Sequence, residues 1–415
     1  MYFAQLTIKE YESFWEKHPQ KTFLSATEIG KLREKSGWQV YYVGLKEDKK
    51  IICASMLLSK KRRFNKCEFY SPRGFLMDYN DKELVNTFTK EVKKFVKEKN
   101  GYILRIDPYI INKERDKDGN IVKDGVDNHQ VVDNLKKLGF KAIPIKKREQ
   151  VSWMFSLDID GKTEEDILNN MKSNTRNIIR KTEKFGITIN ELSYEELDEF
   201  YNIMIETGKR REFKIRDISY YQEMYKLFSK KDQIKFYITR LNLKEYVERL
   251  TLELKEKEEK YNNTSDIKRN KGKKEEMKKD IELLTNRIKE ANAIREKEGK
   301  DTITLSGSMF ILIYPEVVYL SSGNYEEYLM FNSQYLIQWE LIKQGIKLGF
   351  KKHNFYGIPE NINEHPKNYG IYAFKRGFDG YVEELIGEYE LPITKHYYIF
   401  KLIHKLKELK NALHL

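Results

Sequence analysis

One segment, residues 243–299, constrains the fold of this chain more than any other. It contains no proline, a single internal glycine at Gly272 and a high density of Lys and Glu, a composition typical of an exposed helix. Apolar residues recur at helical spacing on both sides of a polar break, "NNTSDIKRNKGKK". These residues are Val247, Leu250, Leu254 and Tyr261 before the break, and Ile281, Leu284, Ile288 and Ala291 after it.

The pattern predicts two helices of about 20 residues each, joined by a polar turn. A parallel, dimeric coiled coil is the alternative, but each apolar stripe is short and the break lies midway, which favours folding back. We therefore predict an inserted antiparallel coiled-coil hairpin over residues 243–299. Its charged faces would be solvated surface, with a basic face that docks RNA as the alternative.

The rest of the chain shows a twofold rhythm of elements. Each half places two helices before a run of strands, followed by a helix and one further strand. This predicts an α/β (α+β) fold with tandem acyl-CoA N-acyltransferase-like (GNAT) domains. The expected limits are 1–149 for the first domain, 150–242 with 300–392 for the second, and 393–415 for a C-terminal helix. A single helix is expected over residues 163–186.

Charge and cysteine content narrow the class of protein. The 415 residues include 77 Lys and Arg against 64 Asp and Glu, a net charge of +13. This excess favours polyanionic partners, although an AT-rich genome also produces Lys-rich proteins. The two cysteines, Cys53 and Cys67, form no CxxC pair, and no targeting segment or long apolar span occurs. We expect a cytoplasmic protein that contacts a membrane at most peripherally.

Asp107 is a candidate for proton chemistry because it ends the predicted strand "LRIDPY" and precedes Pro108. A carboxylate there could accept a proton or orient an amine, and the alternative is a turn cap. Acyl-CoA enzymes hold their cofactor with a Gly-rich loop at a helix start. The equivalent stretch here, "LSSGNYEEYLMF", has one glycine, which weakens an acetyl-CoA interpretation.

Several basic residues could hold phosphates. Arg176 and Arg180, with Lys181 beside them, fall on one face of a predicted helix that could equally be solvated surface. Arg216 and Tyr220, spaced four apart, could hold a diphosphate or form a simple cation–π pair. The seven histidines are scattered, so a metal site or a Ser-His-Asp triad is not expected.

The stretch "YGIYAFKRGFDG" places Lys375 and Arg376 between Phe374 and the turn-forming glycines Gly377 and Gly380. Taken alone, such a pair is more typical of a solvated charge cluster than of a reactive site.

Taken together, these motifs closely resemble the Fem family of non-ribosomal peptidyltransferases, which build the interpeptide bridge or branch of bacterial peptidoglycan. The similarity covers "FYSPRGFLMDYNDKELV", "LRIDPYI", "DNLKKLGF", "MKSNTRNIIRKTEKFGI", the inserted hairpin, "VVYLSSGNYEEYLMFNSQYLIQWELIKQGIKLGFKKHNFYGI" and "FKRGFDGYVEELIGEYELPI". It implies tandem acetyltransferase-like domains in which aminoacyl-tRNA replaces acyl-CoA, with no resident cofactor. The implied reaction transfers Gly, Ala or Ser to the stem-peptide amine of lipid II or UDP-MurNAc-pentapeptide.

The resemblance also implies roles for individual residues. Phe374 and Lys375 match the family's FK pair, and Lys375 would stabilise the tetrahedral intermediate or the tRNA terminal phosphate. Asp107 matches the strand-end carboxylate thought to orient the amine. Lys35, Arg216 and Tyr220 match positions that hold the diphosphate and sugar of the precursor. The hypothesis for tRNA contact comprises Arg176, Arg180, Lys181 and Arg376.

Two rival functions stay open at this point: an acyl-CoA-dependent N-acyltransferase, and a noncatalytic tRNA-binding protein. The sequence leaves open the transferred amino acid, its position in the bridge and the choice between lipid-linked and UDP-linked acceptor. It also leaves open the oligomeric state and whether other Fem-family proteins are partners.

Overall fold

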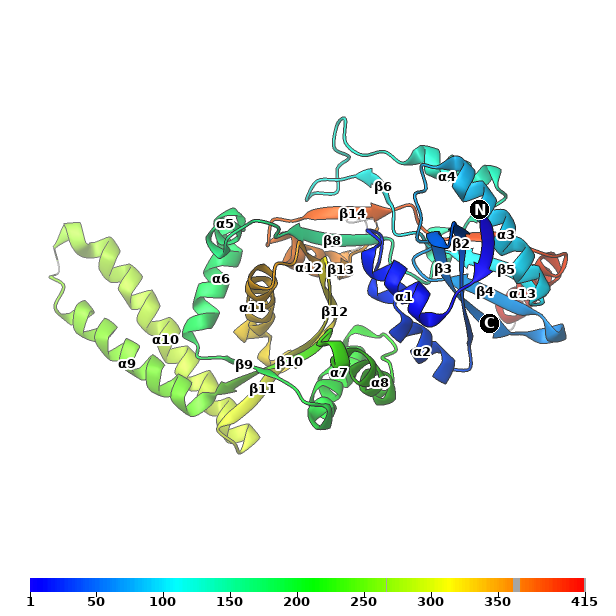
Figure 1. The fold of residues 1–415 in the computed structure, drawn as a ribbon. Coiled ribbons are helices and arrows are strands. Elements are labelled where there is room, and N and C mark those ends of the chain that lie inside the picture. Colours follow the sequence, from blue (N-terminus) through cyan, green and yellow to red (C-terminus); the bar gives the residue numbers. More distant parts are fainter. Residues whose placement is uncertain (266, 361–365, 414–415) are drawn as a thin grey trace. The chain divides into compact units, whose positions relative to one another are not determined.

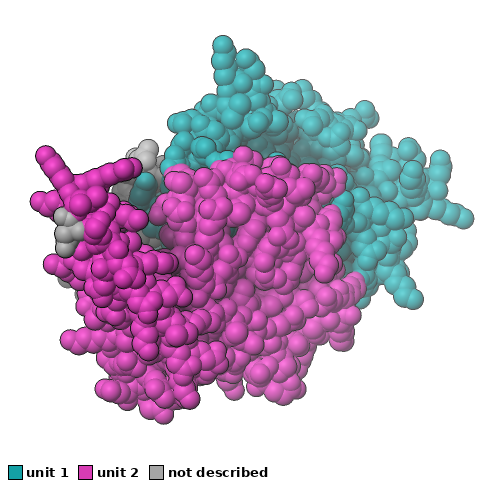
Figure 2. Space-filling model, turned by 90° about the vertical axis from the view of Figure 1, so that its left-hand side faces the viewer, with its two compact units in different colours: residues 1–158, 313–318, 352–415 teal, residues 159–312, 319–351 magenta. Residues whose placement is uncertain are grey.

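The computed structural model describes residues 1–265, 267–360 and 366–413. The chain divides into two compact units, each of mixed α/β structure, which are coloured separately in Figure 2. Unit 1 comprises residues 1–158, 313–318 and 352–415, and unit 2 comprises residues 159–312 and 319–351. Figure 1 labels the elements of both units.

Unit 1 contains most of the strands. They are β1 (Tyr2–Gln5), β2 (Gln39–Glu47), β3 (Lys50–Lys61), β4 (Cys67–Ser71), β5 (Gly101–Ile106), β6 (Ile111–Glu114), β7 (Lys141–Ala142), β8 (Trp153–Asp158), β13 (Lys352–Gly357), β14 (Tyr381–Leu385) and β15 (Tyr389–Pro392). Its α-helices are α1 (Ile8–Lys17), α2 (Thr27–Lys35), α3 (Lys82–Glu98), α4 (His129–Lys137), α12 (Pro366–Arg376) and α13 (His396–Leu413). Short 3₁₀ turns cover Phe23–Ser25, Arg63–Asn65 and Ile145–Lys147.

The first sheet lies wholly in unit 1 and has the strand order β1-β2-β3-β4-β5-β15-β7. Helix α3 covers it because Val85, Phe88, Val92 and Val96 recur at helical spacing and are all buried. The Asp81 side chain caps α3 by accepting from the Leu84 N–H at 3.0 Å. The apolar face of α3 therefore fixes the crossover between β4 and β5.

Strands β4 and β5 run parallel, so both of their carboxyl ends meet at one edge of the sheet. The turn that follows β4 and the residue that follows β5 are therefore brought together. Sequence separation hides this proximity, which the parallel pairing creates.

The second sheet has the strand order β6-β14-β8-β13-β12-β11-β10-β9. Strands β6, β14, β8 and β13 belong to unit 1, and β9 and β10 belong to unit 2. Strands β11 (Thr302–Ile313) and β12 (Glu316–Asn324) contribute residues to both. Strands β12 and β13 pair in parallel through Glu316–Val318.

Unit 2 is richer in helix. Its α-helices are α5 (Glu164–Asn170), α6 (Ser173–Lys184), α7 (Leu197–Arg211), α8 (Ile218–Phe228), α9 (Leu243–Asn262), α10 (Lys271–Glu298) and α11 (Ser333–Lys347). Its strands are β9 (Thr188–Glu191), β10 (Ile234–Asn242) and β11 (Thr302–Ile313), with the later part of β12. The 3₁₀ turns are Tyr194–Glu196, Ser229–Lys231, Lys268–Asn270 and Glu326–Phe331.

Helices α9 and α10 follow β10 in the chain and precede β11. They pack side by side, as Figure 1 shows. Leu250 of α9 lies in one apolar cluster with Leu284 and Ala291 of α10. Lys257 forms an ion pair with Asp280 across the two helices. Val247, Leu254 and Ile288 of the predicted stripes pack against the same cluster, whereas Tyr261 and Ile281 are not part of it.

The helix predicted over residues 163–186 is wrong as a single element. The chain is extended at Met171 (φ −59°, ψ 152°), and α5 and α6 are separate helices. The physical reason is that Met171 is buried, and the Arg176 guanidinium donates to its carbonyl at 2.9 Å. Helix α8, for which no separate element is predicted, follows an Asp217 N-cap position.

The C-terminal part of the chain returns to the first sheet. Strand β15 pairs antiparallel with β5, between Tyr389–Ile106 and Pro392–Ile103. The compact units therefore follow other limits than the predicted domains, because residues 352–415 belong with residues 1–158. The last two residues of the predicted helix over 393–415 lie outside the described part.

Candidate active site

The carboxyl ends of β4, β5 and β13 carry the polar residues that define the candidate site in unit 1. Asp107 directly follows β5 and is 2% exposed. Its Oδ1 accepts from the Arg73 backbone N–H at 2.8 Å and from the Tyr70 hydroxyl at 2.9 Å. The turn after β4 therefore holds the carboxylate in one orientation.

The other carboxylate oxygen, Oδ2, is buried and accepts no hydrogen bond from any residue that the structure describes. It lies 3.5 Å from Nη1 of Arg73 in an ion pair. Burial raises the pKa of Asp107 to about 7, against the opposing effect of Arg73. Asp107 Oδ2 is thus a buried oxygen that is ion-paired with Arg73 and accepts no hydrogen bond among the described residues.

Arg73 is a residue that sequence reasoning missed. It is 3% exposed, lies in the left-handed region at φ 57°, and donates from Nη1 to the Val151 carbonyl at 3.1 Å. Burial raises the pKa of Tyr356, and the nearby Arg73 cation opposes this rise. An arginine between Pro72 and Gly74, straight after an apolar strand, was the available signal.

Gly74 makes this turn possible. It has φ +73°, and a Cβ built there would lie 2.8 Å from the Pro108 Cα and 2.8 Å from the Tyr79 hydroxyl. Only glycine lets the turn after β4 approach the chain after β5 this closely.

Lys375 lies in the last turn of α12, not in a solvated cluster, and is 5% exposed. Its Nζ donates to the carbonyl of Gly357 at 2.6 Å and to that of Tyr356 at 3.3 Å, at the end of β13. Burial lowers the pKa of Lys375 to about 7. Two acceptors among the described residues leave the third N–H of the ammonium for an incoming oxyanion.

Tyr356 joins the two halves of the site. Its carbonyl accepts from Lys375, and its hydroxyl lies near the Arg73 guanidinium, which pairs with Asp107. Tyr356 itself has φ 62°, so both linking residues, Arg73 and Tyr356, adopt the left-handed backbone that bulky residues avoid. Such strain, of order 1–3 kcal/mol per residue, is concentrated at functional sites.

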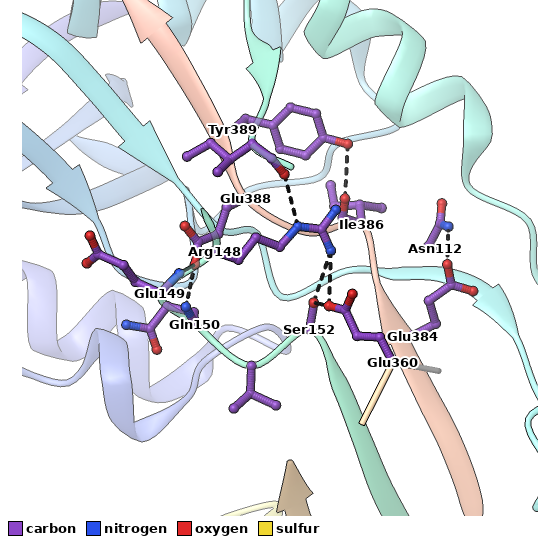
Figure 3. A network of polar contacts seen from close by, with 12 residues as sticks. Asn112, Arg148, Glu149, Gln150, Ser152, Glu360, Glu384, Ile386, Glu388 and Tyr389 are labelled. Carbon is purple, nitrogen blue, oxygen red and sulfur yellow. Dashed lines mark hydrogen bonds and ion pairs between the residues drawn. The ribbon is translucent and has the colours of Figure 1, made fainter. Parts of the chain in front are cut away.

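The segment before β8 supports the site from behind. The buried Glu388 accepts from the backbone N–H of Glu149 at 2.6 Å and from that of Gln150. Figure 3 shows Glu388 beside both residues, and it holds the chain just ahead of Val151, the acceptor of Arg73.

Arg148 holds the same segment from the other side. It donates to the Ile143 carbonyl at 3.1 Å, to the Ser152 hydroxyl at 3.0 Å and to Glu360 at 3.3 Å (Figure 3). A Cβ on Gly387, which has φ +89°, would lie 2.7 Å from the Arg148 guanidinium carbon.

The other predicted binding residues differ in their surroundings. Phe374 packs on Phe378 with ring centroids 5.6 Å apart and supports the end of α12. Lys35 is exposed at the C-terminal end of α2 in unit 1. In unit 2 the Arg216 guanidinium lies 5.5 Å from the Tyr220 ring centroid, which is the cation–π alternative that the spacing allows.

The residues of the tRNA hypothesis divide into engaged and exposed side chains. Arg176 donates to carbonyls at the end of α5, and Arg376 forms an ion pair with Asp118, so both have structural roles. Arg180 is exposed, and Lys181 lies 5.8 Å over the Phe185 ring.

Metal ligation and membrane crossing have no support in the described residues. Across residues 1–265, 267–360 and 366–413, no group of three or more His, Cys, Asp or Glu side chains is placed to hold a metal ion. In the same part of the chain, no helix combines the length and apolar content needed to cross a membrane.

The chain is similar to known proteins over nearly its whole length. The model of the FemAB family matches residues 6–405. The chain is 31% identical to the aminoacyltransferase FemA of Staphylococcus epidermidis, over 98% of this chain and 100% of that protein. It is 30% identical to the aminoacyltransferase FemB of the same species, over 98% and 99%.

A solved structure agrees with the fold. The crystal structure of FemX superposes with a TM-score of 0.75 at 24% identity, covering 96% of this chain and 99% of that one. Because the match to the family spans nearly the whole chain, the protein belongs to the FemAB family and is an aminoacyltransferase.

Proposed function

We propose that this enzyme transfers a small amino acid, Gly, Ala or Ser, from aminoacyl-tRNA to the stem-peptide side-chain amine of a peptidoglycan precursor, and so builds the interpeptide bridge. The acceptor is lipid II or UDP-MurNAc-pentapeptide, and no resident cofactor takes part. The fold proposal is a tandem pair of acetyltransferase-like domains with the α9–α10 coiled-coil hairpin inserted in the second. Family membership supports the proposed fold and reaction, and the geometry around Asp107 supports the proposed reaction.

One observation matters most: Asp107 and Lys375 are both buried and are linked through Arg73 and Tyr356 within unit 1. In aminoacyl transfer, the acceptor amine attacks the ester carbonyl carbon, and the carbonyl oxygen becomes an oxyanion. The C–O bond to the tRNA ribose then breaks, the ribose oxygen takes a proton, and the nitrogen loses one. A carboxylate can accept a hydrogen bond or a proton from the attacking nitrogen, and an ammonium can stabilise the oxyanion.

Asp107 Oδ2 would accept a hydrogen bond from the incoming amine, because Oδ1 already accepts from Arg73 and Tyr70. Lys375 would direct its third N–H at the oxyanion. The ester is already activated, so positioning and charge stabilisation suffice for the reaction. Lys35, Arg216 and Tyr220 would bind the diphosphate and sugar of the precursor, and Phe374 would line the site.

The proposed tRNA contacts are made by exposed cations. Arg180 and Lys181 are exposed, whereas Arg176 and Arg376 have structural partners. We expect Arg180→Gln with Lys181→Gln to weaken tRNA binding more than Arg176→Lys does. Peripheral contact with the inner face of the cytoplasmic membrane would bring the enzyme to a lipid-linked acceptor.

The experiment is transfer of radiolabelled Gly, Ala and Ser from charged tRNA to purified lipid II and to UDP-MurNAc-pentapeptide. Wild type is compared with Lys375→Ala, which removes the cation, and with Lys375→Arg, which keeps it. Loss of one positioned oxyanion donor costs on the order of 100-fold in rate, so Lys375→Ala should be slow yet folded. Turnover of acetyl-CoA without tRNA would overturn the proposal in favour of acyl-CoA chemistry.

A further inference from the structure

Helix α13 presents an apolar face outward, although it is the last helix of unit 1. Its inner side is anchored: Tyr397 is 2% exposed and donates to Glu390 of β15 at 2.6 Å, and Phe400 stacks on Tyr102 at 4.4 Å. Figure 1 shows α13 in red next to β5 of the same sheet. The docking side of the helix is therefore accounted for.

The opposite side of α13 carries four large apolar residues that face solvent. Tyr398 and Leu402 are each 59% exposed, Leu406 is 57% exposed and Ile399 is 42% exposed. Since successive residues of a helix advance by about 100°, these four fall in one arc of about 100°, opposite Tyr397 and Phe400. Large apolar residues gathered in this way mark an interaction site.

A second exposed aromatic residue, Phe64, lies beside the docking side of α13 and not within the exposed arc. The 3₁₀ turn between β3 and β4 places Phe64 outward at 65% exposure, and its ring lies 5.9 Å from that of Phe400. Phe64 adopts φ 57°, a left-handed backbone that holds the ring at the tip of the turn. Lys61, Arg62 and Arg63 directly precede it and are exposed.

The surface is basic throughout. Exposed lysines adjoin the apolar residues on α13, at Lys395, Lys401 and Lys405, and Lys141 lies 5.1 Å over the Tyr398 ring. The acids nearby are partnered: Glu390 pairs with Lys401, Glu408 pairs with Lys147 at 3.6 Å, and Glu68 pairs with Arg62. Cations therefore remain in excess around the exposed apolar arc.

We propose that this surface, formed by the outer face of α13, docks the enzyme on a bilayer that contains anionic phospholipid. Leu402 and Leu406 would enter the interfacial region, while the neighbouring lysines reach lipid phosphates with their long side chains. Each such cation near an anionic surface strengthens binding.

Other occupants fit less well. A second copy packed through the same surface would bring cations against cations, because a twofold interface pairs a patch with itself. A nucleic acid would match the charge but would leave the aliphatic side chains of Ile399, Leu402 and Leu406 against phosphates. The combination of aliphatic arc and basic rim is that of an interfacial helix.

The inference rests on the proposed function, because a lipid-linked acceptor would give membrane binding its purpose. Vesicle binding can be tested separately from amino-acid transfer. Sedimentation measures binding of the full chain to vesicles of phosphatidylglycerol and phosphatidylcholine, and to vesicles of phosphatidylcholine alone. The apolar variant is Leu402→Ser with Leu406→Ser, and the charge variant is Lys395→Gln with Lys405→Gln. All of these residues are exposed, so the variants should fold.

Matched controls have the same chemistry elsewhere. Leu252→Ser with Leu283→Ser changes exposed leucines of α9 and α10, and Lys90→Gln with Lys93→Gln changes exposed lysines of α3. We expect the apolar variant to bind anionic vesicles about tenfold more weakly, and the charge variant to lose the preference for phosphatidylglycerol. Both controls should stay within about twofold of wild type.

Wild-type binding that ignores phosphatidylglycerol, or an apolar variant that binds as wild type does, would overturn the inference. Two further outcomes would also overturn it. In one, the apolar variant loses a concentration-dependent dimer but still binds vesicles; in the other, it loses tRNA binding but still binds vesicles. Transfer to the water-soluble UDP-linked acceptor separates the two proposals. If wild type binds vesicles but transfers to neither acceptor, the proposed function fails and the docking surface stands. If wild type transfers to an acceptor but does not bind vesicles, the docking surface fails and the proposed function stands.

Discussion

Burial shifts the pKa values of Asp107 and Lys375 in opposite directions, so that the two values become similar. The pKa of Asp107 rises to about 7 and that of Lys375 falls to about 7. Asp107 is therefore anionic mainly above pH 7, and Lys375 is cationic mainly below it. If the reaction uses an anion to orient the amine and a cation for the oxyanion, pH controls both groups in the physiological range.

This gives a pH prediction that isolates Lys375. Lys375→Arg keeps a charge at every accessible pH, whereas wild-type Lys375 loses its proton above its pKa of about 7. The ratio of wild-type to variant transfer rates cancels the ionisation of the acceptor amine. We expect this ratio to fall about tenfold per pH unit above pH 7. A ratio that is constant from pH 6 to pH 9 would contradict a role for the Lys375 cation.

The same pKa shift predicts a change in stability. Because the pKa of Lys375 is lower in the folded protein than in the unfolded chain, the unfolded state binds more protons between about pH 7 and 10.5, and stability rises with pH across that window. Lys375→Met removes this dependence on pH. We expect the stability of Lys375→Met relative to wild type to be about 2 kcal/mol greater at pH 6 than at pH 9.

Urea unfolding at pH 6 and pH 9 measures that difference. The control is Lys90→Met, which removes an exposed lysine of α3 and should change stability equally at both pH values. An equal effect of Lys375→Met at pH 6 and pH 9 would show that Lys375 is not buried as described.

At this scale a strand-end position makes Asp107 of "LRIDPY" a candidate, whereas Lys375 of "AFKRG" becomes one only through the resemblance to the Fem family. The sequence does not lead to Arg73 or Tyr356. Both act through backbone conformation and through contacts between segments remote in sequence, which no local pattern encodes.

At the scale of elements, the turn after β4 decides whether Arg73 can reach Asp107. Gly74→Ala imposes a positive φ on a residue with a Cβ and a clash with the Pro108 backbone at 2.8 Å. Gly37 has φ +77° but nothing within 4 Å of a built Cβ, so Gly37→Ala reports the backbone cost alone.

We expect Gly37→Ala to lower the free energy of unfolding by about 1 kcal/mol. Gly74→Ala should cost roughly a further 1–3 kcal/mol, because the backbone must shift, and it should slow transfer as well. Chemical denaturation compares the two variants. Equal losses would show that the turn tolerates a Cβ and does not need close approach.

The split of the predicted helix into α5 and α6 shows where pattern-based prediction stops. Helical spacing continues across Met171, but burial of this residue and the Arg176 contacts with the end of α5 outweigh local propensity. The α9 and α10 stripes are different: their partners are adjacent in the chain, so the packing is local and readable.

At the scale of the whole molecule, the longer strands are predictable because each is a run of apolar and β-prone residues between turns. Strands β3 and β11, for example, are buried along most of their length. The return of β15 to pair with β5 is not predictable, since it joins residues 389–392 to residues 103–106. The family match over residues 6–405 covers residues of both units, so family membership does not rest on one unit alone.

The most direct measurement is single-turnover transfer from charged tRNA to lipid II and to UDP-MurNAc-pentapeptide by wild type, Lys375→Ala and Lys375→Arg, with tRNA binding measured in parallel. We predict transfer to at least one acceptor, on the order of 100-fold slower with Lys375→Ala, with most of the rate kept in Lys375→Arg and tRNA binding little changed. Transfer at the wild-type rate by Lys375→Ala would contradict the site proposed around Asp107 and Lys375.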